Sequence, residues 1–320
     1  MSSPLSLPPV MAPVLTPFAR DLSTDVERFV RLCRWLIGAG VALAVFGTTS
    51  EANSLATAEK LDLLDALAAA GIPGDRIVPG TGCCAFPDTV ALTRAALAHG
   101  CAGVLMLPPF YYKNVSDDGL FASYAEVIER VGDARLRIYL YHIPPVAQVP
   151  LGVPLIERLL LRYPSTIAGI KDSGGDFAFT ERLIRTFAPR GFAVYAGSET
   201  FLLPTLAAGG AGCISATANV NPAAMLSLAR DWRASDAAAR QEALDAVRQA
   251  FQKFPLVPAL KAALARGTGD DGWRATRPPL VRLDDAARAT LFAALPAGFL
   301  PPSIRPRRRG FSSAPRSARR

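Results

Sequence analysis

Residues 167–173 read Ile-Ala-Gly-Ile-Lys-Asp-Ser, a short apolar run that ends in a lysine and is followed by polar residues. This pattern predicts a buried strand with polar groups at its carboxyl end. The amphipathic stretch Phe177–Phe187 follows it and predicts a helix. The same unit, a short apolar run and then a longer amphipathic stretch, recurs eight times up to about residue 233. Such repetition indicates βα units and a parallel sheet.

The strands of these units are expected at Val10–Leu15, Ala42–Phe46, Arg76–Pro79, Gly103–Leu107, Arg137–Tyr141, Ile167–Ile170, Phe192–Ala196 and Gly212–Ser215. The helices are expected at Thr24–Gly38, Ala58–Ala70, Asp88–Ala98, Asp117–Val131, Val153–Leu161, Phe177–Phe187, Glu199–Ala207 and Pro222–Trp232. Eight such units close into a (β/α)8 TIM barrel, with the active site at the carboxyl ends of the strands. A doubly wound sheet is the competing architecture. The barrel is favoured because Thr16-Pro17-Phe18, after the first strand, is not a Gly-rich phosphate-binding loop.

Three more helical patterns follow the barrel, at Asp236–Gln252, Leu256–Arg266 and Asp284–Ala294. We expect residues 1–233 to form the barrel, 234–298 a C-terminal helical extension of the same domain, and 299–320 a disordered arginine-rich tail. The last 20 residues hold seven arginines and no acidic residue, so they carry most of the net charge of +8. The rest of the chain is close to neutral, and we expect no specific nucleic-acid partner.

The composition also limits location and metal binding. No apolar run approaches the roughly 18 residues of a membrane span, and the first ten residues lack the features of a secretory signal. We therefore expect a cytoplasmic enzyme with no membrane contact. The five cysteines have no CxxC spacing and mostly lie in apolar or Gly-rich segments, as reduced core residues do. With only two histidines in the chain, no metal site is expected.

Lys171 is the candidate reactive residue. Only five of the 35 basic residues are lysines, so a chain that uses arginine for surface charge has kept a lysine at this strand end. Arginine cannot form an imine, because its guanidinium stays protonated. Tyr141 ends the preceding strand of the expected barrel and should lie beside Lys171. A phenol next to an amine can take up and return the protons that imine formation requires.

Further polar segments follow other strands. Gly47-Thr48-Thr49-Ser50-Glu51 offers hydroxyl and N–H groups to a small carboxylate, although a simple polar turn fits the same residues. Gly197-Ser198-Glu199 and Ile214-Ser215-Ala216-Thr217 are placed to contact the part of a substrate remote from the amine. Taken alone, each of these also fits an ordinary βα turn.

These motifs resemble those of the dihydrodipicolinate synthase and N-acetylneuraminate lyase family of class I, Schiff-base aldolases. The resemblance covers roughly residues 8–295. It rests on Gly47-Thr48-Thr49-Ser50-Glu51, Tyr111-Tyr112, Tyr141-His142-Ile143-Pro144, Gly169-Ile170-Lys171-Asp172-Ser173 and Gly197. It implies a 2-oxo acid, usually pyruvate, held as an imine on Lys171 without any cofactor. It also implies that Thr48 and Thr49 hold the carboxylate and that Tyr141 relays protons.

The resemblance further implies that Tyr112 enters the site of a neighbouring subunit and joins the relay, so a homodimer or homotetramer is expected. The predicted catalytic residues are Lys171, Tyr141, Thr48 and Tyr112. The predicted substrate-binding residues are Thr48, Thr49, Gly197, Glu199 and Ile214.

Three positions depart from the family pattern. The diaminopimelate-pathway synthases carry an arginine five residues after the shuttle tyrosine, where it binds the carboxylate of the aldehyde partner, and this chain has Val146 there. We therefore do not expect dihydrodipicolinate synthesis. Ser50 replaces a glycine, which would tighten the loop if that position needs positive φ. His142 replaces an asparagine, and a supporting hydrogen bond is favoured over a direct acid or base role.

The leading hypothesis is thus a carbon–carbon lyase or synthase of the aldolase type that acts on a 2-oxo acid. A dehydratase or hydratase-aldolase that uses the same imine is one alternative. A barrel that binds a 2-oxo acid as a non-catalytic sensor is another. Pyridoxal phosphate bound as an aldimine on Lys171 is disfavoured, because the sequence has no Gly-rich phosphate cradle.

Overall fold

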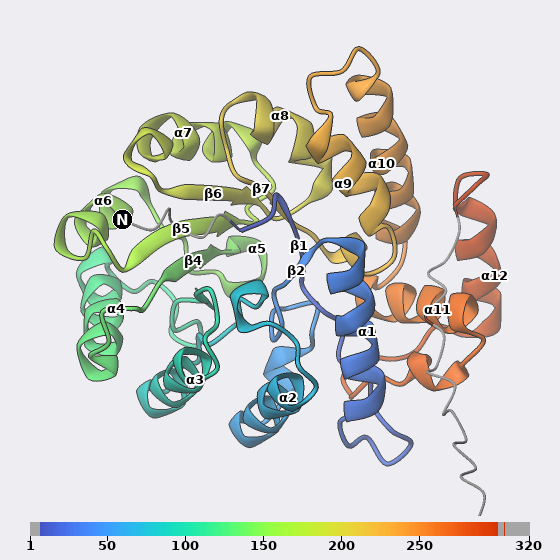
Figure 1. The fold of residues 1–320 in the computed structure, drawn as a ribbon, viewed down its shortest axis with the longest axis horizontal. Helices are drawn as coiled ribbons and strands as arrows, with labels where there is room; N and C mark the ends of the chain where they lie inside the picture. Colours follow the sequence, from blue (N-terminus) through green and yellow to red (C-terminus); the bar gives the residue numbers. More distant parts are fainter. Residues whose placement is uncertain (1–6, 300–303, 305–320) are drawn as a thin grey trace, which may run out of the picture.

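The computed structural model describes residues 7–299 and residue 304. Seven parallel strands form one curled sheet at the centre of the molecule, and helices surround it (Figure 1). In chain order the strands are β1 (Val10–Ala12), β2 (Ala42–Leu43), β3 (Val104–Met106), β4 (Ile138–His142), β5 (Ile167–Asp172), β6 (Ala193–Ala196) and β7 (Gly212–Ile214).

The segment expected as the third strand closes the sheet into a ring. The strand order is β2-β1-β7-β6-β5-β4-β3, which leaves β2 and β3 at the two edges. Between these edges Ile77 pairs with Leu43, and Gly80 pairs with Leu105, as isolated parallel bridges. The expected strand is reduced to these bridges, since Pro79 has no N–H to donate to β3. The ring confirms the predicted (β/α)8 barrel and excludes a doubly wound sheet.

Helices cover the outside of the barrel. They are α1 (Val26–Ala39), α2 (Thr57–Ala69), α3 (Phe86–Ala98), α4 (Asp117–Val131), α6 (Val153–Arg162), α7 (Phe177–Phe187), α8 (Leu202–Ala207) and α9 (Pro222–Arg230). A short helix, α5 (Pro144–Ala147), follows β4, and a 3₁₀ turn at Glu199–Phe201 precedes α8. Each long outer helix thus follows one strand or strand-like segment of the ring.

Local sequence explains where these helices begin and end, as α4 illustrates. The Ser116 side chain accepts a hydrogen bond from the Gly119 N–H at 3.2 Å and caps the first turn. Gly132, with a φ of 64°, ends the helix in the left-handed conformation that glycine adopts most readily. The buried residues recur every three or four positions, at Leu120, Tyr124, Val127 and Val131. This spacing directs one face of the helix onto the sheet.

The inside of the barrel is packed with side chains. One cluster of buried residues comes from the inward-facing positions of the ring, and its members include Met11, Ala42, Val78, Leu105, Tyr139, Tyr141, Tyr195 and Ile214. Two larger apolar clusters lie between the sheet and the outer helices. Filling the interior with side chains leaves the carboxyl ends of the strands as the place for a binding cavity.

Three helices follow the barrel: α10 (Ala237–Gln252), α11 (Leu256–Thr268) and α12 (Asp285–Ala294). Figure 1 shows them together on the side of the barrel where α1 and α9 lie. Of the tail predicted from residue 299 onward, the structure describes only Phe299 and Ile304, and the Ile304 side chain is buried in the core. The remainder of the predicted tail lies outside the described residues.

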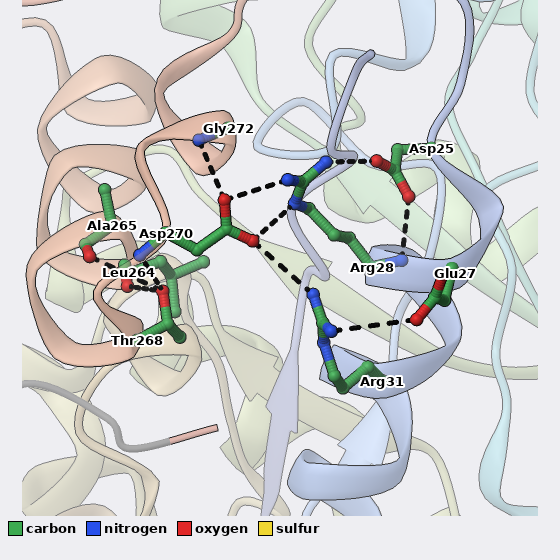
Figure 2. A network of polar contacts seen from close by, with 9 residues as sticks. All are labelled: Asp25, Glu27, Arg28, Arg31, Leu264, Ala265, Thr268, Asp270 and Gly272. Carbon is green, nitrogen blue, oxygen red and sulfur yellow. Dashed lines mark hydrogen bonds and ion pairs between the residues drawn. The ribbon is translucent and has the colours of Figure 1, made fainter. Parts of the chain in front are cut away.

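An ion pair links α1 to the segment after α11 (Figure 2). The Arg28 guanidinium donates two hydrogen bonds of 2.8 Å to the Asp270 carboxylate. The Asp25 carboxylate binds the same guanidinium, and Arg31 lies 3.7 Å from Asp270. The hydrogen bonds from Arg28 hold the pKa of the Asp270 carboxyl below its usual value.

Within the described part of the chain, no helix combines the length and the apolar character needed to cross a membrane. The five cysteines are free thiols. Burial raises the pKa of Cys33 and Cys213, which are core residues as expected, whereas Cys84 is exposed. The cytoplasmic location stays a prediction.

Candidate active site

Lys171 and Tyr141 lie opposite each other in the register of the neighbouring strands β5 and β4. The Lys171 Nζ donates a hydrogen bond to the Tyr141 Oη at 3.3 Å. The same phenolic oxygen lies 3.1 Å from the Thr48 Oγ1, which belongs to the loop after β2. Lys171 and Tyr141 are almost fully buried. Amine, phenol and hydroxyl therefore form a continuous line along which a proton can move.

This line opens into a cavity of about 440 Å³ at the carboxyl ends of the strands. Six of the predicted site residues line the cavity: Thr48, Thr49, Tyr141, Lys171, Gly197 and Ile214. Two other predicted residues, Glu199 and Tyr112, are not among those that line it. The structure thus brings together Lys171, Tyr141 and the threonine pair, as their strand-end positions predict.

The loop that carries Thr48 and Thr49 is held by its own polar groups. The Ser50 hydroxyl accepts a hydrogen bond from the Gly47 N–H at 3.1 Å. The Ser50 carbonyl accepts one from the Thr16 hydroxyl at 2.7 Å. The residue with positive φ is Glu51, at 56°, and Ser50 is not among the positive-φ residues of the described chain. A serine therefore fits at position 50 without backbone strain.

His142 faces away from the cavity and supports the end of β5. Its Nδ1 lies 2.9 Å from an oxygen of the buried Asp172 carboxylate. The same carboxylate accepts hydrogen bonds from the Thr180 hydroxyl at 2.5 Å and from the Gly174 N–H at 2.9 Å. These contacts fix the residue next to Lys171. His142 thus makes the supporting hydrogen bond that was favoured for it.

Gly197 is confined by the neighbouring strand end. Its N–H donates to the Asp172 carbonyl at 2.6 Å, so β5 and the loop after β6 are in close contact. A Cβ atom at this position would come within 2.0 Å of the Ser173 Oγ. Only glycine therefore fits here without displacing the segment that follows Lys171.

Glu199, predicted to contact substrate, is tied into a buried polar network instead of lining the cavity. Its carboxylate accepts hydrogen bonds from the hydroxyls of Ser215 and Thr217. It also lies 3.5 Å from the Arg248 guanidinium. In this arrangement Glu199 joins the loops after β6 and β7 and orients the arginine. A direct substrate contact by Glu199 stays a prediction.

Arg248 is a cavity residue that the sequence analysis missed. It comes from α10, lines the cavity together with Gln252, and its side chain is only 11% exposed. Its Nη1 lies 3.5 Å from Glu199 and from the Ser215 hydroxyl, while its Nε is buried without a hydrogen-bond partner. Val146 lines another part of the cavity and is 60% exposed. The cavity thus has a guanidinium on the α10 side and an apolar residue at position 146.

Tyr111 and Tyr112 lie in the loop after β3 and project outward. Both side chains are more than 70% exposed, and their rings meet edge to face with centroids 5.3 Å apart. Such exposure of two large aromatic rings is unusual on a free surface. The role predicted for Tyr112 in a neighbouring subunit stays a prediction.

Across residues 7–299 and 304, no group of three or more His, Cys, Asp or Glu side chains is arranged so that it could hold a metal ion. The polar groups of the cavity include an amine, a phenol, hydroxyls, an amide and a guanidinium, and the carboxylate among its lining residues, Asp172, is bound by His142, Gly174 and Thr180. These groups suit an organic acid better than a cation.

Residues 7–297 match the Dihydrodipicolinate synthetase family in a comparison with models of protein families. The chain belongs to this family. The predicted resemblance is confirmed, and so is the classification of the protein as a lyase. The match spans the barrel and nearly all of the helical extension, so α10, with Arg248, lies within the family's common region.

Individual relatives agree with this assignment. An uncharacterized DapA-like lyase of Chloroflexus aurantiacus is 34% identical over 289 residues, which cover 89% of this chain and 95% of the relative. The crystal structure of dihydrodipicolinate synthase from Agrobacterium tumefaciens is 33% identical, with a TM-score of 0.83 and coverage of 89% of this chain and 97% of that one. A prophage protein of the dihydrodipicolinic acid synthase family from E. coli K12, solved in complex with pyruvate, is 28% identical with a TM-score of 0.81, covering 89% of this chain and 96% of that one.

Proposed function

We propose that this lyase binds pyruvate or another 2-oxo acid as an imine on Lys171 and makes or breaks a carbon–carbon bond next to it. The observation that carries the proposal is the hydrogen-bonded line of Lys171, Tyr141 and Thr48 at the floor of the cavity. A structure of a relative that contains pyruvate supports the choice of ligand. The threonine pair of the 47–51 loop lines the same cavity and offers hydroxyl groups to the carboxylate.

The reaction needs several proton transfers that Tyr141 is placed to make. The Lys171 amine attacks the keto carbon, and Tyr141 gives its proton to the carbinol oxygen, which leaves as water. A cationic imine then remains beside the Tyr141 phenolate. In the cleavage direction the hydroxyl of the leaving half gives its proton to Tyr141, and the bond electrons move to the imine nitrogen to form an enamine. Tyr141 then returns the proton to the enamine carbon, and water releases the 2-oxo acid.

The second half of the substrate lies on the α10 side of the cavity in this proposal. Arg248 presents a guanidinium there, which binds carboxylate or other acidic and hydroxylated groups well. Val146 occupies the place of the arginine that the diaminopimelate-pathway synthases use, so we do not propose that reaction for this protein. We propose aldol cleavage or condensation as the reaction. Dehydration is the alternative, since it passes through the same imine and differs only in the group that leaves.

Borohydride trapping tests the imine. The purified protein is reduced in the presence of pyruvate, and the modified peptide is located by mass spectrometry. We expect an adduct on the Lys171 peptide and none in the variant Lys171→Met, with the other lysines as internal controls. Absence of an adduct with pyruvate and with a panel of 2-oxo acids would reject the mechanism and favour the sensor hypothesis.

The proposed oligomer rests on the exposed tyrosine pair. If Tyr112 completes the site of a second subunit, the protein is at least a dimer in solution. Mixing inactive Tyr112→Phe and Lys171→Met proteins should then restore part of the activity, because some mixed sites would contain both native residues. Light scattering that gives a monomer, with no restoration on mixing, would reject a shared site.

A further inference from the structure

The loop that presents Thr48 to Tyr141 has a strained backbone. Phe46 and Glu51 flank it, and both have positive φ values, 61° and 56°, that non-glycine residues rarely adopt. The Glu51 N–H donates a hydrogen bond to the Thr48 carbonyl at 3.1 Å, so the backbone of Glu51 is joined directly to that of Thr48. Strain of this kind persists only where surrounding contacts hold the loop. The contacts that hold Glu51 therefore also fix the position of Thr48.

The Glu51 carboxylate is held from the C-terminal helices. One oxygen accepts a hydrogen bond from the Lys261 Nζ of α11, and the other accepts one from the Arg277 N–H at 3.3 Å. Lys261 also donates to the Ala275 carbonyl at 2.7 Å. The side chains of Glu51 and Lys261 are at most 1% exposed. The loop of the proposed relay is thus fastened to residues more than 200 positions away in the chain.

The burial of this pair makes it sensitive to the loss of either partner. Burial lowers the pKa of Lys261 to about 8, while the Glu51 carboxylate opposes that shift. A buried charge whose partner is removed must be neutralised or must move toward solvent. For Glu51 such movement would carry the turn with it and break the contact between Thr48 and Tyr141.

We propose that Lys261, through Glu51, is a positioning residue that sets Thr48 against Tyr141, and that the C-terminal helical extension serves catalysis in this way. This inference rests on the proposed imine function. Lys261 does not line the cavity, so its effect passes through the loop and not through a contact with substrate. A misplacement of about 1 Å in such a relay costs on the order of 10²-fold in rate.

The chain offers a matched control. Arg28 and Asp270 also join the barrel to the segment after α11, with two hydrogen bonds of 2.8 Å (Figure 2). The polar side-chain contacts of these two residues, including those with Asp25, Gly272 and Arg31, do not reach the 47–51 loop, and neither residue lines the cavity of Lys171. The variant Asp270→Asn therefore weakens the attachment of the extension without touching the proposed relay.

The experiment measures exchange of the pyruvate methyl protons in D₂O by NMR, which needs the imine and the relay but no second substrate. Three variants are compared with the wild type for the saturating exchange rate, the KM for pyruvate and the unfolding midpoint in urea. Lys261→Met is expected to be both unstable and slow. Lys261→Met/Glu51→Gln removes both charges, so its stability should recover while its rate stays about 10²-fold low. Asp270→Asn should lose stability and keep its rate within about twofold.

The inference is overturned if the rate follows stability, that is, if the double variant regains the wild-type rate or if Asp270→Asn is slowed as much as Lys261→Met. Should Lys261→Met not fold, the double variant alone decides, because it leaves no unpaired buried charge. Wild-type protein that forms no adduct and exchanges no protons would instead overturn the proposed function. The two failures are therefore distinguishable.

Discussion

Lys171 and Lys261 are both almost fully buried, yet their surroundings differ in kind. The Lys171 amine donates to a phenol and lies at the edge of a cavity. The Lys261 amine donates to a carboxylate and a backbone carbonyl in the packed interface between barrel and extension. A neutral partner and open space leave an amine able to react, whereas an ionic partner and close packing hold it in place. Burial alone thus does not distinguish the lysine that we propose to react from a structural one.

The strongest way to test this difference is to make the same substitution at both positions, beginning with Lys171→Met. We expect the rate of pyruvate proton exchange to fall by at least about 10⁴-fold, because the nucleophile is gone. The free energy of unfolding should change by no more than about 1 kcal/mol, since no buried charge loses its partner. Exchange kinetics and urea unfolding measure the two effects. A Lys171→Met variant that still exchanges pyruvate protons would contradict the proposed role of Lys171 as the nucleophile.

Lys261→Met should show the opposite balance, with stability as the main loss. Leaving the Glu51 carboxylate buried without its ammonium partner costs about 3–5 kcal/mol. Urea unfolding monitored by circular dichroism gives this value, and adding Glu51→Gln should restore most of it. Equal stability of Lys261→Met and the wild type would mean that the pair is not formed in solution.

The proton relay beside Lys171 gives the next effect in size. Tyr141→Phe keeps the packing of the ring and removes the oxygen that contacts both Lys171 and Thr48. We expect the exchange rate to fall by about 10²–10³-fold, within the range found for removal of a general acid or base. Slow trapping of pyruvate on Lys171 should persist. Thr48→Val is the milder control, since Tyr141 would keep its contact with the amine.

The sequence predicts the barrel and the placement of Tyr141 beside Lys171 well, because both follow from local pattern. Strand ends at Tyr141 and Lys171 can be recognised from apolar runs, and neighbouring strands in a barrel bring them together. The third strand was predicted as a regular strand, but Pro79 within it has no N–H for the ladder, and only isolated bridges form. Periodicity therefore predicts which elements form and their order better than it predicts their lengths.

Long-range contacts were the part that sequence could not supply. Arg248 and Lys261 lie on helices whose approach to the barrel depends on tertiary packing, and their spacing carries no motif. The partners of the Glu199 carboxylate, Ser215 and Thr217, likewise could not be read from the sequence, and the predicted substrate contact of Glu199 stays a prediction. Side-chain partners of this kind are decided by rotamers and neighbouring loops. A weak signal did exist: Lys261 is one of few lysines and lies in an apolar helix.

The smallest expected effect concerns the partly exposed counterpart of the Lys261 pair, the Arg28–Asp270 link in Figure 2. The Asp270 pKa lies below its usual 3.8 in the folded protein, first because Arg28 donates to it. The stabilisation is therefore complete above about pH 4 and is lost as the pH falls through the lowered pKa. Asp270→Asn keeps an oxygen that can cap the Gly272 N–H, but it removes the charge and replaces the oxygen that accepts from the Arg28 Nε.

For Asp270→Asn we expect a loss of about 1 kcal/mol at pH 6, discounted because both side chains are partly exposed. The difference from the wild type should shrink steadily below pH 4, and added salt should also reduce it. Urea unfolding at several pH values measures this. A loss of several kcal/mol, or one that does not vary with pH, would mean that the partly exposed link behaves like the buried Lys261–Glu51 pair. The expected difference in stability between the partly exposed Arg28–Asp270 pair and the buried Lys261–Glu51 pair would then be rejected.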